Sequence, residues 1–376
     1  MLHVNDYRSA GGAEIVMHRS VEALRGRGIQ AECFTIDDVE GHRRTPLSYA
    51  HNRRAVAALA RRVMSFDPDM VHLHNVYHEL SPAVLSVPKR CGRPAVVTAH
   101  DWNMICPNPV ASVFTADGLE AVDLDDPLSV TDLVAKRWDE SFPRRIARVV
   151  QHVANYRLRD RRGDLDAVFC PNRDQARIFR GHLDAPVHHL VNPAAAMERI
   201  TSTVGSKRFV FAGRVEPEKG LSVFLRSAPQ RFIDDLVVVG DGSELEACRD
   251  IVRHRNASTL FTGRVSADEA ARRIAACETI VIPSLCPELG PLVALDALAA
   301  GRRLLVARNG GLAELADHHD AAIGFDPRTP QDVVRACDHV LENTHVASAS
   351  LAPASAGDDY VDQLIDQYNT VLANHP

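Results

Sequence analysis

The stretch RFVFAGRVEPEKGL, residues 208–221, decides the fold class of this chain, because it joins an apolar strand to a helix through a glycine turn. The same order of strand, glycine turn and helix returns in LVVVGDGSELEACRDIV, residues 236–252. It returns again in STLFTGRVSADEAARRIAACETIVIPS, residues 258–284, which runs on into a further strand. A regular alternation of strands and helices predicts parallel sheets with helices on both faces.

The alternation covers the whole chain of 376 residues, which is long for one hydrophobic core and predicts two domains. Residues 192–206, NPAAAMERITSTVGS, lack apolar periodicity and mark the expected hinge. We therefore expect domains at 1–195 and 207–355, followed by an amphipathic helix at 356–376. Strands are expected at 1–4, 31–36, 69–74, 95–99, 166–170 and 186–191 in the first domain, and at 208–212, 236–240, 258–262, 278–282, 302–307 and 321–325 in the second.

Composition narrows the class of protein. The net charge of −6 is mild and argues against nucleic acid as the main partner. The eight cysteines contain no C-x2-C pair, which indicates a reducing cytoplasm and offers no zinc site. No apolar run approaches the ~20 residues of a membrane span, and the start, MLHVNDY, does not resemble a signal peptide. A cytoplasmic location is the expectation.

The segment PSLCPELGPLVALDALAAG, residues 283–301, carries a pair of acids around a helix start. A strand runs into a loop that holds Glu288, and Pro291 is expected to open a helix that carries Asp296. The first turn of such a helix binds anions through its N–H groups and its dipole. Two acids beside an anion site suit a nucleotide-sugar, with phosphate in the middle and hydroxyls at both ends. The alternative is a surface acid in a loop and a solvent-facing acid on a helix.

This segment resembles the E-x7-E signature of retaining glycosyltransferases of family four. The resemblance implies the GT-B fold, in which two Rossmann-like doubly wound domains face a central cleft and a final helix crosses back to the first domain. It implies that Glu288 binds the donor sugar and that Asp296, where the family usually has Glu, binds the ribose. The intervening residues assigned to the donor site are Leu289, Gly290, Leu292 and Val293.

The stretch at residues 208–221 resembles the family element G-R-x3-x-K-G, whose cations clamp the donor diphosphate. Arg214 and Lys219 match its two basic positions. Two preplaced cations would stabilise the charge that builds up on a departing nucleoside diphosphate, so no metal and no cofactor is expected. A solvated basic loop is the alternative. The resemblance also places the nucleotide pocket beside two glycine turns, at Gly240 and Asp241 and at Arg264 and Val265.

Two elements of the first half complete the resemblance. Gly11 and Gly12 precede a helix and match a G-G-x-E element near the donor phosphates or the acceptor; we expect Ile15 on the inner side of this helix. AVVTAHDWNMICP, residues 95–107, resembles the family run T-x-H-D-x-x-x-x-C-P, which implies that His100 contacts the donor sugar and that Asp101 orients it or touches the acceptor. For Gly11 and Gly12 the alternative is an ordinary loop before a helix. For His100 it is a histidine at a strand end that caps a neighbouring loop.

Other polar clusters are assigned no catalytic role. His72 and His74 share one face of a strand, but no third zinc ligand is evident, so core or cleft-lining histidines are expected. Asp67-Pro68-Asp69 precedes a strand and is expected to form a turn. The basic stretch 136–162 contains a segment of helical apolar spacing, which fits a solvated helix better than peripheral contact with an anionic membrane.

The sequence thus predicts a GT-B glycosyltransferase. It would move a hexose-type sugar from UDP or GDP to a hydroxyl acceptor, which is lipid-linked in many members of the family, with retention of configuration. Two alternatives stay open: an inverting transferase with His100 or Asp101 as base, and a non-catalytic subunit that binds sugar nucleotides.

Overall fold

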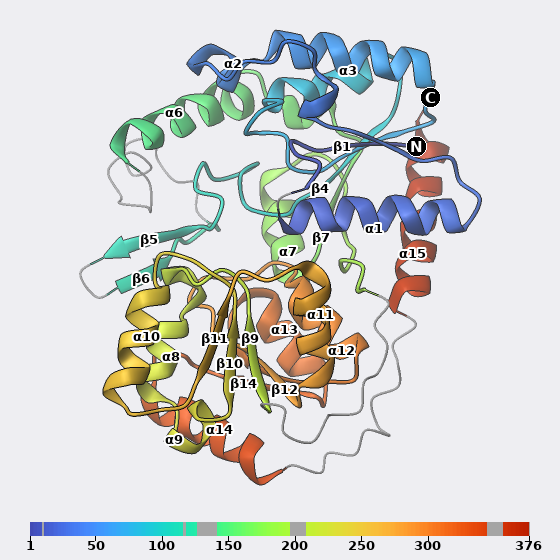
Figure 1. Ribbon diagram of the computed structural model, residues 1–376. Helices are drawn as coiled ribbons and strands as arrows, with labels where there is room; N and C mark the ends of the chain where they lie inside the picture. The colour runs from blue at the N-terminus through green and yellow to red at the C-terminus, as the bar shows by residue number, and fades with distance from the viewer. Residues whose placement is uncertain (10, 116–117, 126–140, 196–207, 344–355, 376) are drawn as a thin grey trace. The chain divides into compact units, whose positions relative to one another are not determined.

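The computed structural model describes residues 1–9, 11–115, 118–125, 141–195, 208–343 and 356–375. The chain divides into two compact units (Figure 1). Unit 1 comprises Met1–Pro193 together with Asp358–Pro376, and unit 2 comprises Ala194–Gly357. Most of the expected hinge, from residue 196 on, and residues 136–140 of the basic stretch lie outside the described residues.

Unit 1 is built on a six-stranded parallel sheet with the order β2-β1-β3-β4-β7-β8. Every strand expected in the first half is confirmed, and four of the six are fully buried, mostly apolar runs, which suit parallel strands. The carboxyl ends of β1, β3 and β4 lie side by side, which brings the residues after them together. The strands are β1 Leu2–Val4, β2 Glu32–Phe34, β3 Val71–Leu73, β4 Ala95–Thr98, β7 Ala167–Cys170 and β8 Val187–His189.

The helices of unit 1 follow the strands as expected, but the expected burial of one side chain, Ile15, was wrong. In α1 the buried residues include Val16, Met17, Val21 and Leu24, whereas Ile15 is 44% exposed. The expectation for Ile15 was wrong, because it lies outside the i, i+3, i+4 row that faces the sheet. The helices are α1 Gly12–Gly26, α2 Pro46–Ala50, α3 Arg53–Phe66, α4 Val87–Arg90, α6 Phe142–His152 and α7 Arg173–His182, with single turns at Ile36–Asp38, Pro82–Ser86, Val153–Arg157 and Arg161–Asp164.

A small hairpin was not anticipated from the sequence. β5 Ser112–Thr115 and β6 Gly118–Ala121 pair antiparallel, with Ser112 opposite Ala121. Its strands are four residues long and carry few large apolar side chains, so they give little alternation for a sequence pattern to detect.

The C-terminal helix α15, Ala356–Asn374, belongs to the core of unit 1. In Figure 1 it runs beside the sheet near the N-terminal strand. Its residues Tyr360, Leu364 and Tyr368 share a hydrophobic cluster with Leu24 of α1 and Phe169 of β7. The Tyr360 hydroxyl lies 2.6 Å from Ser20 Oγ. The C-terminal helix therefore contributes to the hydrophobic core that packs against the sheet of unit 1.

Unit 2 has a second six-stranded parallel sheet, in the order β11-β10-β9-β12-β13-β14. All six strands expected in the second half are confirmed. They are β9 Phe209–Ala212, β10 Leu236–Val239, β11 Leu260–Gly263, β12 Thr279–Ile282, β13 Arg303–Ala307 and β14 Ala322–Phe325. The helices are α8 Leu221–Ser227, α9 Gln230–Ile233, α10 Leu245–His254, α11 Ala267–Ala276, α12 Leu292–Ala299, α13 Gly310–His318 and α14 Pro330–Glu342.

Alternate residues of these strands enter two different cores, because successive side chains of a strand point to opposite faces. Phe209 and Phe211 pack with α8, α10 and α14, whereas Val210 packs with α11, α12 and α13. Figure 1 shows these helices on the two sides of the sheet. The doubly wound α/β class is therefore confirmed in unit 2, and in sheets of this class ligands bind beyond the carboxyl ends of the strands. Among the described residues, no helix is long and apolar enough to span a membrane.

Candidate active site

An ion pair between Lys219 and Glu288 forms the centre of the candidate site in unit 2. Lys219 Nζ lies 2.6 Å from Glu288 Oε1, and Ser284 Oγ donates to the same oxygen at 2.6 Å. Burial opposes both charges, but the pair outweighs it, so the pKa of Lys219 is raised and the pKa of Glu288 is lowered. Both groups are therefore charged at neutral pH.

Gly220 explains why these two residues meet. It has φ 68°, which glycine adopts without strain, and a Cβ atom at this position would overlap the carbonyl oxygen of Pro283. The start of α8 is thereby pressed against the end of β12. The backbone N–H of Leu285 also donates to Glu218 at 2.8 Å. The loop after β12 then presents Glu288 to Lys219.

Arg214 lies at the other end of the loop between β9 and α8, which also carries Lys219. Its guanidinium bonds Glu218 Oε1 at 2.8 Å, and its side chain is 64% exposed. Arg214 also contributes to lowering the pKa of Glu288. The structure thus brings together the two predicted diphosphate-binding cations and the predicted sugar-binding acid.

The predicted nucleotide-binding turns lie beside this loop. A Cβ atom on Gly240, with φ 142°, would overlap the carbonyl oxygen of Gly213, so only glycine allows the close approach. Val215 donates from its N–H to the carbonyl of Asp241 at 2.9 Å. Gly240 in turn donates to Gly263 at 3.0 Å, immediately before Arg264 and Val265. The three turns form one continuous edge after β9, β10 and β11.

The helix expected from Pro291 begins one residue later. α12 starts at Leu292, and Pro291 is its extended N-cap residue, whose carbonyl accepts the N–H groups of Ala294 and Leu295. Leu289 and Gly290 lie in the loop before it, and Val293 is in its first turn. Asp296 is on this helix, where Oδ1 accepts the N–H of Ala195 at 2.7 Å.

The sequence interpretation missed the groups that support the Glu288 loop. Gly311 donates its N–H to the Glu288 carbonyl at 2.5 Å, and a Cβ atom on Gly310 would press against that same carbonyl. Asn309 Nδ2 donates to the Ser284 carbonyl at 2.6 Å. The motif Asn-Gly-Gly after a buried strand was the available signal, since it predicts a turn with close backbone approach.

Two buried histidines, His74 and His3, form a hydrogen-bonded chain with His100, the predicted catalytic residue of unit 1. His100 Nε2 lies 2.9 Å from His74 Nδ1, and His74 Nε2 lies 3.0 Å from His3 Nδ1. The residues follow or belong to the adjacent strands β4, β3 and β1. Burial lowers the pKa of His100 to about 4 and that of His3 to about 3, so the chain is neutral at pH 7.

His3 is a neighbour of His72 and His74 that sequence reasoning did not find. The three offer ligand atoms within 4.8 Å of one another. However, the rings of His72 and His74 stack at 4.5 Å with an angle of 14°, so their in-plane lone pairs run nearly parallel and do not converge on one ion. His72 also contacts Thr98 Oγ1 at 2.8 Å and the Tyr368 hydroxyl at 2.5 Å. The arrangement favours hydrogen bonding over metal ligation.

Asp101 is held beside His100 by partners that the motif did not reveal. The Tyr77 hydroxyl and the N–H of Asn103 both donate to its carboxylate. Burial raises the pKa of Asp101 to about 6, and these hydrogen bonds and Arg148 limit that rise. Asp101 is therefore mostly ionised at neutral pH.

Gly11 and Gly12 lie after the carboxyl end of β1, at the exposed start of α1. Glu14 in the first turn is buried and accepts a hydrogen bond from Asn5 Nδ2 at 2.9 Å. Both glycines therefore belong to unit 1 and follow β1, the strand that neighbours β3.

Both halves of the chain match models of glycosyltransferases. Residues 10–194 match the family described as Glycosyltransferase Family 4, and residues 206–343 match the one described as Glycosyl transferases group 1. An uncharacterised glycosyltransferase of Methanocaldococcus jannaschii is 31% identical over 145 residues, 36% of each chain. The 2-deoxystreptamine N-acetyl-D-glucosaminyltransferase of Niallia circulans is 30% identical over 155 residues, 40% of each chain. The matched segments thus span well under half the length of these curated relatives.

Among solved structures, the Anabaena protein HepE in complex with UDP and glucose has a TM-score of 0.65 at 15% identity. The match covers 98% of this chain and 99% of that one. At such low identity the likeness establishes the fold, and the GT-B class expected from the sequence is confirmed.

Proposed function

We propose that this chain, a glycosyltransferase of the GT-B fold, transfers a hexose-type sugar from a nucleoside diphosphate to a hydroxyl acceptor. The proposed transfer retains the anomeric configuration. The observation that carries the proposal is the largely buried, charged pair of Lys219 and Glu288 beside Arg214. UDP and glucose in the Anabaena neighbour support a nucleotide-sugar donor for this chain as well.

In the proposed reaction, Lys219 and Arg214 bind the diphosphate oxygens. Lys219 is already positioned by Glu288 and does not have to be reorganised as charge develops on the leaving group. Arg214 can bind two oxygens at once through its planar guanidinium. Glu288 retains a second carboxylate oxygen, which can accept a hydroxyl of the donor sugar.

The proposed retaining step needs no protein base. The bond from the anomeric carbon to the diphosphate breaks, and the acceptor oxygen bonds to that carbon on the same face. The acceptor's proton passes to the departing phosphate oxygen. His100, neutral through burial, would donate a hydrogen bond to a sugar hydroxyl. Asp296 would bind the ribose, and the turns after β10 and β11 would contact the base.

One observation favours a second candidate, an inverting transferase. Asp101, with a pKa raised to about 6 by burial, is mostly ionised at pH 7 and could accept the acceptor's proton directly. The anomeric configuration of the product, read by NMR, decides between the two. A retained configuration supports the same-face step, and an inverted one supports Asp101 as base.

Donor binding is the primary test. A thermal-shift panel of UDP- and GDP-sugars should raise the melting temperature for one donor class, since a specific ligand stabilises the folded state by mass action. The shift should disappear in Lys219→Ala. Absence of any shift across the panel would refute the proposal, and binding without turnover on any acceptor would indicate a non-catalytic subunit.

A further inference from the structure

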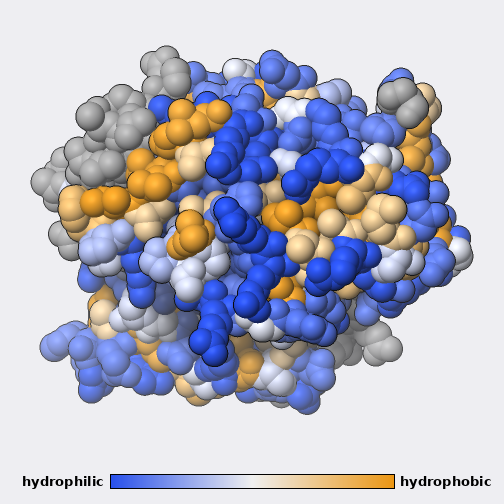
Figure 2. All heavy atoms as spheres, turned by 90° about the horizontal axis from the view of Figure 1, so that it is seen from above, coloured by the Kyte–Doolittle hydropathy of each residue, from blue (hydrophilic) through white to orange (hydrophobic). Residues whose placement is uncertain are grey.

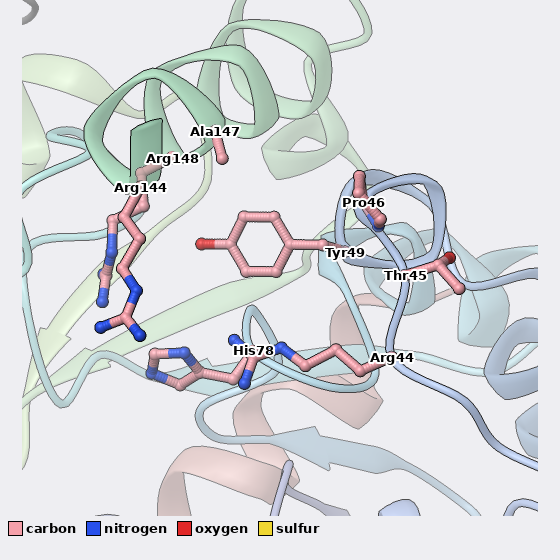
Figure 3. Close-up of a pocket in the computed structure, with 8 residues that line it drawn as sticks. All are labelled: Arg44, Thr45, Pro46, Tyr49, His78, Arg144, Ala147 and Arg148. Atoms are coloured by element: carbon pink, nitrogen blue, oxygen red, sulfur yellow. The ribbon is translucent and has the colours of Figure 1, made fainter. Parts of the chain in front are cut away.

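Unit 1 contains a basic pocket of about 600 Å³ that none of the predicted site residues lines. Its walls come from α2, α6 and the loop after β3 (Figure 3). We call it the arginine pocket and define it by Arg44, Tyr49, His78, Arg144 and Arg148. In Figure 3 the Tyr49 hydroxyl points toward Arg144 and Arg148, and the Arg44 side chain extends toward His78.

The arginine pocket concentrates positive charge. Three guanidinium groups line it, and its described lining includes no acid. Arg44 is positioned by an ion pair with Glu79 at 3.3 Å, and Glu79 also contacts His42 at 2.8 Å. Burial, Arg148 and Arg44 lower the pKa of His78 to about 4, so this ring is neutral and can accept or donate a hydrogen bond.

The walls of the arginine pocket are tied together by buried polar contacts. Gln151 of α6 donates to the carbonyls of Tyr49 at 2.5 Å and Tyr77 at 2.8 Å. The carboxylate of Asp6 accepts the N–H groups of His78, Glu79 and Leu80, which fixes the loop that carries His78. The basic groups are thus presented by a preformed frame, which lowers the entropy cost of binding a ligand.

The arginine pocket also adjoins the predicted reacting centre. His78 follows Tyr77, whose hydroxyl donates to Asp101. Arg148, from the pocket wall, contributes to holding down the pKa of Asp101. A ligand that occupies the arginine pocket therefore lies close to the group that would contact the acceptor hydroxyl.

We propose that the arginine pocket binds a phosphate group carried by the acceptor. The proposal rests on the proposed function and names its acceptor class. A phosphate offers several charged oxygens, and planar guanidinium groups bind such oxygens in pairs. The Tyr49 hydroxyl and the His78 ring add hydrogen bonds, and the volume leaves room for the sugar or polyol that bears the phosphate.

The phosphate could belong to a soluble metabolite or to a lipid headgroup. Beside the arginine pocket, α6 exposes Phe142, Ile146 and Val150 at 56%, 39% and 55%, one turn apart on one side of the helix. Figure 2 shows hydrophobic residues next to strongly hydrophilic ones over the face that carries α3 and α6. This apolar row is the reason to test a lipid source as well.

The test is calorimetric titration of the full-length protein with glycerol phosphate in the presence of saturating UDP or GDP, whichever binds, which fills the predicted diphosphate position. Arg144→Ala and Arg148→Ala should each weaken glycerol phosphate by about tenfold or more, as loss of a charged hydrogen-bond partner does. Arg145→Ala is the matched control, because Arg145 is on the same helix but does not line the pocket. Glycerol without phosphate should not bind.

The results separate this proposal from the proposed function. If UDP or GDP binds but glycerol phosphate does not, or if glycerol phosphate binds equally to Arg144→Ala, Arg148→Ala and Arg145→Ala, the arginine pocket proposal is overturned while the donor site stands. If neither UDP nor GDP binds, the proposed function fails. Arg144 is exposed, so its variant remains informative even if Arg148→Ala unfolds.

A second arm identifies the source of the phosphate. Phosphatidylcholine vesicles with and without phosphatidylglycerol are sedimented with the wild type, Arg144→Ala and Arg145→Ala. Sedimentation that needs phosphatidylglycerol and Arg144 but not Arg145 supports a lipid-linked acceptor. Glycerol phosphate binding without sedimentation supports a soluble phosphorylated acceptor.

Discussion

The Nδ1 atom of His74 lies 2.9 Å from Nε2 of His100. This contact decides which nitrogen of His100 is available to a ligand, since the other is occupied by His74. His3 occupies the far nitrogen of His74 in the same way. The orientation of the predicted sugar-contacting histidine is thus fixed by the strands β1 and β3, and His74 acts as a positioning residue.

His74→Phe keeps the aromatic stack but removes both ring nitrogens. We expect kcat to fall on the order of 10- to 100-fold, because a misplaced contact at the reacting centre is costly. The KM for the donor should change little, since the diphosphate contacts are made by other residues. Nitrogen NMR of His100 should report a changed tautomer balance; unchanged His100 shifts together with full kcat would show that His74 does not position it.

Lys219→Ala should lower kcat by about 10²-fold or more, because it removes a charge partner of the leaving diphosphate. It also leaves the largely buried Glu288 without its main counter-charge. Lys89→Ala, at a 62% exposed lysine of unit 1, serves as the control and should keep kcat. Steady-state kinetics at saturating donor measures both; near-normal turnover in Lys219→Ala would count against the diphosphate assignment.

Asp296→Ala should mainly raise KM for the donor, because a ribose contact is made equally in the ground and transition states. Asp296→Asn keeps a side-chain oxygen that can accept the N–H of Ala195. Comparing it with Asp296→Ala therefore separates the effect of that hydrogen bond from the effect of the carboxylate charge. A large loss of kcat at unchanged KM would give Asp296 a different role.

The raised pKa of Asp101 predicts that the free energy of unfolding depends on pH. Its folded pKa of about 6 exceeds the ordinary 3.8, so the folded state binds this proton more tightly than the unfolded state does. The stability of the wild type relative to Asp101→Asn should therefore fall as pH rises through this window, by about 3 kcal/mol in total. Urea unfolding of both proteins at several pH values measures it, and a difference that stays constant would mean that Asp101 is not held in a desolvated site.

Gly220→Ala tests the close approach that forms the donor site. Gly28 has φ 78° and no atom within 4 Å of its hypothetical Cβ, whereas Gly220 has φ 68° and Pro283 in the way. Gly28→Ala should cost about 1 kcal/mol of unfolding free energy for its backbone strain alone, and Gly220→Ala should cost clearly more. Equal losses would show that the contact with Pro283 relaxes at no cost. Chemical denaturation provides the comparison.

Much of the fold could be predicted from the sequence, because it is specified by local chemistry. Short apolar runs followed by turn residues marked most of the twelve strands of the two sheets, and the regular alternation with helices marked the others. The β5–β6 hairpin was missed because its pairing depends on contacts between short segments with little pattern of their own. The start of α12 was misplaced by one residue, since proline is compatible with both the N-cap and the first helical position.

The sequence by itself determined the doubly wound class and the types of residue at the candidate site, since a motif after each strand places its side chains at the sheet edge. Only the tertiary structure decided what those side chains contact. His3 reaches His74, Lys219 reaches Glu288, and arginines of α6 and the segment before α2 line one pocket. These pairings join residues that are distant along the chain, and the order of strands and the packing of helices, which no local pattern records, bring them together.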